Sequence, residues 1–139
     1  MKIIILISIL ITFSFADYTD NGNLTITNNL NGLIWQDDSD SNSIQETWLD
    51  AINYCDSLTV DGNSDWRLPN INELVSLIDH SKSSTKIDDA FTYKIDSYYW
   101  SSSTYVNNKS NAWLINFETA STDSAQSKTN TIHVRCVSN

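Results

Sequence analysis

Basic residues are scarce in this chain. Lysine and arginine make up only 8 of its 139 residues, against 17 aspartates and glutamates, which gives a formal net charge of −9. A protein this acidic repels phosphate and sulfate groups at long range, so nucleic acids and heparin-like polysaccharides are disfavoured as partners. The carboxylates are scattered between apolar segments, which indicates a folded acidic domain rather than a disordered acidic tail.

The chain also lacks an apolar run long enough to cross a membrane. Its most apolar segment, residues 3–15, is shorter than the ~20 residues that a membrane-spanning helix needs. This segment follows Lys2 and ends with small residues at positions 14 and 16, as a secretory signal peptide does. We therefore predict that residues 1–16 are a signal peptide, and that the protein is exported by a bacterium, either to the periplasm or, as a secreted protein, to the cell surface. No cysteine lies at the predicted cleavage site, so a lipid anchor is not predicted.

Glycine and proline are too few to mark a domain boundary. The chain has three glycines and one proline, and the polar stretch that leads to Asp89 contains neither. No internal repeat is present. Because domains commonly run to ~100–150 residues, residues 17–139 are predicted to form a single domain.

The two cysteines, Cys55 and Cys136, are predicted to form a disulfide. An even number of cysteines without metal-type spacing indicates a bridge in an oxidising compartment. A bridge that closes so long a loop stabilises the fold by roughly 4–5 kcal/mol in the chain-entropy model. The alternative, a free catalytic thiol, needs a nearby base and a lowered pKa.

The first part of the chain is predicted to be a β-hairpin. Residues 24–27 alternate between apolar and polar, residues 28–32 have turn-forming asparagine and glycine, and residues 33–35 form a second short strand. Residues 37–42 are predicted to be a polar loop.

Two helices are predicted to follow. The first helix has one apolar face, which is formed by residues spaced four and three positions apart: Trp48, Ile52, Cys55 and Leu58. Thr47 is its predicted N-cap, and it should end near Gly62. The second begins after Pro69 with Asn70 as its cap and should stop around residues 79–81. Its apolar stripe is Leu74, Leu77 and Ile78.

The last third of the chain is predicted to form strands, over residues 98–102, 112–117 and 131–137. In the last of them, His133 and Arg135 share one face, with His133 on the outer side of the sheet. The opposite face holds Ile132, Val134 and Cys136. The fold class is therefore α+β, with two helices packed on a small antiparallel sheet.

Several sequence phrases occur in a fixed order, within residues 31–36, 48–55, 65–77, 99–102, 112–117 and 134–137. Together they resemble the Lcl C-terminal domain family, a domain of unknown function found in Legionella collagen-like adhesins. The most specific phrase is Trp-Arg-Leu-Pro-Asn at residues 66–70. The resemblance implies a fold akin to C-type lectins and to the formylglycine-generating enzymes, and a Cys55–Cys136 bridge. Those adhesins bind sulfated glycosaminoglycans, but this chain has no Gly-X-Y tract and its net charge opposes that ligand.

Calcium binding is not predicted, and no cofactor is expected. C-type lectins hold calcium with a Glu-Pro-Asn loop, but Leu68 replaces the carboxylate here. Asp61, Asn63 and Asp65 have the alternate spacing of a calcium loop, yet the sixth position is not glycine and the twelfth is Asn72. A solvated turn is the better interpretation of these residues, and calcium remains the alternative.

The conspicuous aromatic and basic residues are predicted to be structural. Trp66 is predicted to lie in the core, and Arg67 to pair with a carboxylate such as Glu73 or Asp79. The other tryptophans fall on apolar faces and are also predicted to be core: Trp35, Trp48, Trp100 and Trp113.

Catalysis is not predicted. His80 follows a helix and His133 lies on an outer face, without a Gly-x-Ser-x-Gly motif or metal-type histidine spacing. The formylglycine-generating enzymes need reactive cysteines, whereas both cysteines here are explained by a bridge. The protein is therefore expected not to be an enzyme.

Two polar loops are predicted, over residues 103–111 and 120–130. The first holds the residues best suited to bind a hydroxyl-rich ligand: Tyr105, Asn107, Asn108 and Asn111. The alternative is that they are ordinary loop residues. We therefore expect an exported, adhesin-like binding module for a glycan or a protein at the cell envelope or surface. A structural or envelope-assembly domain without a small ligand is the alternative.

Overall fold

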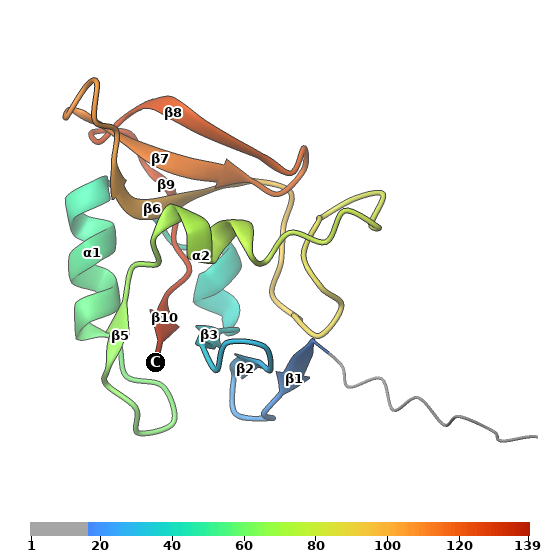
Figure 1. Cartoon of the computed structure of the whole chain (residues 1–139). Coiled ribbons are helices and arrows are strands. Elements are labelled where there is room, and N and C mark those ends of the chain that lie inside the picture. The colour runs from blue at the N-terminus through green and yellow to red at the C-terminus, as the bar shows by residue number, and fades with distance from the viewer. Residues whose placement is uncertain (1–16) are drawn as a thin grey trace, which may run out of the picture.

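A computed structural model describes residues 17–139 of the chain, so the predicted signal peptide lies outside the described residues. These residues form two five-stranded sheets (Figure 1). The first sheet has the order β1-β2-β3-β10-β5 and is antiparallel throughout. Its strands are β1 (Tyr18–Asp20), β2 (Thr25–Asn28), β3 (Ile34–Gln36), β5 (Trp66–Arg67) and β10 (Val137–Ser138).

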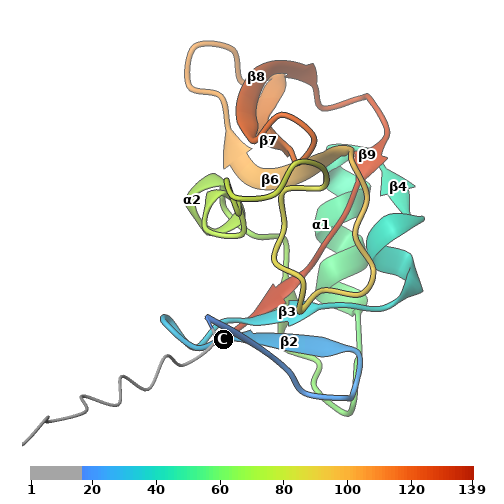
Figure 2. The same ribbon diagram turned by 90° about the vertical axis from the view of Figure 1, so that its right-hand side faces the viewer.

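The second sheet has the order β4-β9-β6-β7-β8. Its strands are β4 (Gln45–Glu46), β6 (Tyr98–Thr104), β7 (Asn111–Asn116), β8 (Ser121–Ser127) and β9 (Ile132–His133). All neighbours are antiparallel except β6 and β9, which run parallel. The α+β class and the β2–β3 hairpin are confirmed, but the structure has two sheets where one small antiparallel sheet was predicted. Figure 2 shows the second sheet above the first, with the helices beside the space between them.

The first helix, α1 (Trp48–Ser57), begins as predicted. The Thr47 side chain accepts a hydrogen bond from the backbone N–H of Asp50, which caps the helix. The helix ends before the predicted position, because Leu58 is already extended. Gly62, with φ of +76°, instead lies in the turn that the following chain makes.

The second helix, α2 (Ile71–Val75), is shorter than predicted. Asn70 caps it by accepting from the N–H of Glu73, as expected. The apolar residues beyond it are still used, since Leu77 is buried and Ile78 forms a β-bridge with Ile87. The apolar spacing extends beyond the end of α2 because the following irregular segment also packs against the core. For this reason the spacing predicted a helix that is too long.

The Cys55–Cys136 disulfide is present, with a Cα–Cα distance of 5.5 Å. It joins the buried face of α1 to the chain just before β10. One core cluster surrounds it, and includes Trp66, Trp100 and Leu114. A second cluster, which includes Trp35 and Phe117, lies on the α2 side.

The predicted strand over residues 131–137 is broken in two. β9 belongs to the second sheet and β10 to the first, and residues 134–136 cross between them. The prediction that His133 faces outward is wrong, because His133 is 8% exposed and Arg135 is 0% exposed. Simple alternation assumes one sheet with a solvent face, whereas this segment passes through the middle of the molecule.

The predicted loop over residues 120–130 is also wrong in part. Its residues 121–127 form β8, which pairs with β7 at the edge of the second sheet. The predicted loop over residues 103–111 is shorter in the structure, because β6 extends to Thr104 and β7 begins at Asn111. The connecting residues 105–110 are called the β6–β7 loop below.

A buried ion pair lies where the predicted polar loop begins. Residues 39–42 of that loop form a 3-10 helix, η1 (Ser39–Asn42). The side chain of Asp37 before it is 5% exposed and contacts the buried Arg135 guanidinium at 3.3 Å. Asp37 also accepts hydrogen bonds from the N–H groups of Thr92 and Tyr93, at 2.8 and 3.0 Å. Arg135 donates to the carbonyl oxygens of Gln36 and Tyr93. This clamp holds the long segment before β6 against the end of β3 and against the segment that crosses between the sheets.

Candidate functional site

The β6–β7 loop brings together the residues predicted to bind a ligand. The backbone N–H of Tyr105 donates to the carbonyl of Asn111 at 3.0 Å, which closes the loop. Inside it, the N–H of Asn108 donates to the carbonyl of Tyr105, and that of Asn111 donates to Asn108. Asn107 and Asn108 are exposed at its tip. The loop is therefore an ordered turn on which the four predicted residues lie close together.

An aromatic pair supports this loop. The rings of Tyr105 and Trp113 meet edge to face, with their centroids 5.5 Å apart. Both side chains are half-buried, so Trp113 is more exposed than its predicted core position implies. The Asn107 side-chain amide donates to the Tyr105 hydroxyl at 3.2 Å. The pair thus presents a partly exposed aromatic surface with an amide beside it.

The two other side chains are used differently. The Asn111 amide donates to the carbonyl of Ser124 on β8, at 3.3 Å. The Asn108 side chain accepts from the N–H of Ser110 at 3.1 Å. Asn111 therefore mainly fixes the loop to the sheet, whereas Asn107 and Asn108 remain at its exposed end.

A second half-exposed tryptophan lies beside this hairpin. Lys128 places its ammonium 3.8 Å from the centroid of the Trp48 ring and donates to the Thr104 hydroxyl at 2.8 Å. Its backbone N–H donates to the carbonyl of Ser110 in the β6–β7 loop. Trp48 was predicted to be core, but it is only half-buried. Lys109 of the loop is a second basic side chain at this end of the acidic protein.

Sequence patterns could not identify Lys128 as part of this surface. It follows Trp48 by eighty residues of chain and meets it only because β8 returns along β7. The signal in the sequence was limited to the asparagine-rich composition of the loop.

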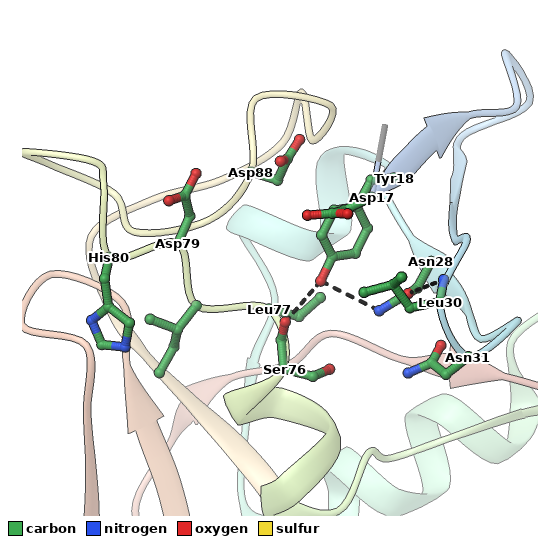
Figure 3. Close-up of a pocket in the computed structure, with 11 residues that line it drawn as sticks. Asp17, Tyr18, Asn28, Leu30, Asn31, Ser76, Leu77, Asp79, His80 and Asp88 are labelled. Atoms are coloured by element: carbon green, nitrogen blue, oxygen red, sulfur yellow. Dashed lines mark hydrogen bonds between the residues drawn. The ribbon is translucent and has the colours of Figure 1, made fainter. Parts of the chain in front are cut away.

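A separate cavity of about 310 Å³ lies between the β1–β2 hairpin and the chain that follows α2 (Figure 3). The Tyr18 hydroxyl crosses it, donating to the carbonyl of Ser76 at 2.8 Å and accepting from the Asn28 amide at 3.4 Å. Tyr18 therefore ties the first strand to the end of α2. No sequence pattern indicates this cavity, because its lining comes from four distant segments.

The charged groups around the cavity are mainly acidic. Asp17, Asp79 and Asp88 line it, together with His80, and the described lining contains no lysine or arginine. Burial, followed by the charges of Asp88, Asp17 and Asp79, raises the pKa of Tyr18 to about 12. This potential opposes the entry of an anionic ligand.

The residues considered as a calcium loop make other contacts. The Asp61 carboxylate accepts from the Asn23 amide at 2.6 Å. Asn63 accepts from the N–H of Asp65 at 3.0 Å and donates to the Ser138 hydroxyl at 2.9 Å. Across residues 17–139, no group of three or more histidine, cysteine, aspartate or glutamate side chains is placed to hold a metal ion. The side chains of Asp61 and Asn63 therefore hold this turn to the β1–β2 turn and to β10.

The Trp-Arg-Leu-Pro-Asn phrase has a structural role. Trp66 is 3% exposed, as predicted. Arg67 pairs with Glu73 at 2.8 Å, rather than with Asp79. Trp35 and Trp100 are fully buried, which confirms the core prediction for these two.

Comparison with known proteins identifies the family of this domain. The model of the Lcl C-terminal domain family matches residues 24–138, which is most of the chain. No curated protein matches the sequence. Within the part of the chain that the structure describes, no helix is long and apolar enough to cross a membrane.

Proposed function

The chain belongs to the Lcl C-terminal domain family, and from that premise we propose that it is an exported binding module that recognises a glycan with the β6–β7 loop. We assign it a C-type-lectin-like fold and a role that is neither enzymatic nor dependent on a cofactor. The Cys55–Cys136 disulfide supports export, because such bridges persist in oxidising compartments. The domain would comprise residues 17–139 after removal of residues 1–16.

The observation that carries the proposal is the half-exposed Tyr105–Trp113 pair beside the Asn107 amide. Sugar rings have apolar C–H faces that pack on aromatic rings, and hydroxyls that exchange hydrogen bonds with amides. Tyrosine offers such a surface at a low entropic cost. The edge-to-face contact with Trp113 fixes the Tyr105 ring before a ligand arrives, so little order is lost on binding.

Charge gives two expectations about the glycan. The net charge of −9 disfavours a polysulfated chain at long range. Lys109 and Lys128, however, make the loop itself the place where a single acidic sugar meets least repulsion. A neutral glycan, or one with isolated acidic sugars, therefore fits the site better than a heparin-like polymer.

The test uses the oxidised protein over residues 17–139. A glycan array with neutral, carboxylated and sulfated arms would select a ligand, and calorimetry would measure its affinity. Tyr105→Ala should weaken binding about tenfold, which corresponds to ~1.4 kcal/mol. Tyr98→Ala is the matched control, because Tyr98 is 40% exposed at the opposite end of β6.

Retained affinity in Tyr105→Ala, or an equal loss of affinity in Tyr98→Ala, would show that the β6–β7 loop is not the glycan-binding site. If no glycan in any arm binds the oxidised protein, glycan recognition is wrong. A structural role in envelope assembly would then be the better explanation of the fold.

A further inference from the structure

Leu24, in the turn between β1 and β2, has an unusual conformation for a leucine. Its φ is +66°, in the left-handed region that glycine and asparagine tolerate best. Its side chain is also 53% exposed. Both features cost free energy, and Gly22 and Asn23 beside it show that better-suited residues occur in the same turn. Backbone outliers of this kind are concentrated at functional sites.

The turn presents Leu24 rigidly. The carbonyl oxygen of Leu24 accepts from the N–H of Asp37 at 2.8 Å, which attaches it to the chain after β3. The neighbouring Asn23 amide donates to Asp61 at 2.6 Å, which attaches it to the turn between α1 and β5. Figures 1 and 2 both show these two turns side by side. The exposed leucine is therefore held in place before any partner binds.

Two hollows adjoin Leu24, one on each side. The first, of about 370 Å³, is lined by Val60 together with Asp38 and Asp61. The second, of about 250 Å³, is lined by Asp20, Asp37 and Tyr93. A protruding apolar side chain between two hollows is a shape into which a partner can place side chains of its own.

The charges around Leu24 have one sign. Asp37 is balanced by Arg135, but Asp20, Asp38 and Asp61 are not paired with a lysine or arginine in any described contact. No lysine or arginine is among the described residues that line either hollow. A second copy of this chain, which also carries a charge of −9, is a poor match.

We propose that Leu24 and its two flanking hollows form a docking surface for a partner protein segment that carries an apolar side chain next to lysine or arginine. The apolar side chain contacts Leu24 and Val60 in the first hollow. The basic side chains reach Asp38 and Asp61 on that side and Asp20 on the other. Complementary charge speeds the encounter and selects the partner, while the apolar contact supplies the affinity.

This surface is separate from the proposed glycan site. The β1–β2 turn lies at the bottom of Figures 1 and 2, whereas the β6–β7 loop lies at the top. The two proposals therefore fail or succeed independently.

The probe is an array of hexapeptides that combine one leucine, isoleucine or phenylalanine with two lysines or arginines. Matched hexapeptides have glutamate in place of the basic residues. Isotope-labelled, oxidised protein over residues 17–139 would be titrated with the best binders, and backbone amide shifts would map the contact. We expect basic peptides to bind, with shifts confined to residues 20–24, 37–38, 59–61 and 92–93, which line the two hollows, and affinity that falls as salt increases.

Leu24→Gly is the decisive variant, because glycine keeps the left-handed turn while it removes the side chain. Binding of the peptides should fall at least tenfold, while the thermal midpoint stays the same or rises. Leu30→Ala is the matched control, because Leu30 is 80% exposed in the next turn and should bind as the unchanged protein does.

Each contrary outcome overturns the proposal. These outcomes are equal binding of basic and acidic peptides, full binding by Leu24→Gly, an equal loss in Leu30→Ala, and shifts elsewhere on the protein. A lowered thermal midpoint in Leu24→Gly would show that the leucine serves the fold and not a partner.

Discussion

Replacing Asp37 should test the buried clamp that joins β3, the crossing segment and residues 92–93. Asp37→Ala removes the anion beside Arg135, whose side chain is 0% exposed, and takes the acceptor from the N–H groups of Thr92 and Tyr93. Removing one partner of a buried ion pair typically costs about 3–5 kcal/mol, because the remaining charge stays buried. The orphaned amides add to this wherever water cannot reach them. We expect a loss of about 4 kcal/mol.

A loss of this size is large for one small domain, whose total stability is about 5–15 kcal/mol. Urea unfolding followed by tryptophan fluorescence measures it directly. With a slope of about 2 kcal/mol per molar urea, the midpoint should fall by about 2 M. Asp37→Asn keeps one acceptor oxygen for the amides and should lose roughly half as much.

A double substitution separates the ion pair from the amide contacts. Arg135→Met replaces the cation with an apolar side chain and leaves Asp37 with both amide donors. Combined with Asp37→Asn, it should cost less than the sum of the two single changes by at least ~1 kcal/mol. The reasoning is refuted if the effects simply add, or if Asp37→Ala costs less than ~1 kcal/mol.

Three further predictions concern other contacts. Replacing Cys55 and Cys136 with alanine should lower the free energy of unfolding by about 4 kcal/mol, since the bridge spans 81 positions; an unchanged midpoint in denaturant would contradict this. Burial lowers the pKa of His133 below 6.5, so the unfolded chain binds the proton more strongly and stability should fall as pH drops through 6.5; His133→Gln should flatten this part of the stability–pH curve. Arg67→Ala should cost less than ~1 kcal/mol in thermal unfolding, because the Arg67 side chain is 39% exposed beside Glu73; a larger loss would mean that the pair is a main support of α2.

Sequence reasoning succeeded where local periodicity decides the structure. The spacing of Trp48, Ile52 and Cys55 matches one helical face, and α1 begins at Trp48 because Thr47 before it can cap the helix. The Cys55–Cys136 bridge was also predictable, since the number of cysteines left few alternatives.

Sequence reasoning failed where the structure of a segment depends on a distant part of the chain against which it packs. β8 is composed mostly of small polar residues, so it has no apolar alternation and forms a strand only because β7 offers an unpaired edge. Arg135 was assigned to the same strand face as His133 because no local pattern indicates that this segment crosses from the second sheet to the first. Asp37 begins a run of polar residues and has no distinguishing pattern, and its partner Arg135 is almost a hundred residues away in the sequence.

The candidate site was predictable in composition but not in shape. Tyr105 and its asparagines were identified because these residue types suit hydroxyl-rich ligands. The exposure of Trp113 and the approach of Lys128 to Trp48 depend on how three strands lie side by side. Leu24 had no signal at all, because a left-handed backbone at leucine contradicts the preference of that residue.

The crossing segment at residues 132–138 has a consequence for the order of folding. β9 lies between β4 and β6, and β10 lies between β3 and β5, so both sheets have gaps until this late segment arrives. The same few residues also supply Arg135 and Cys136. Since these contacts join distant parts of the chain, folding should be slow, and the two sheets should be completed only after the whole domain has been synthesised. A ribosome-bound chain that lacks this segment would remain open to chaperones, and would stay flexible enough to be threaded through a narrow channel.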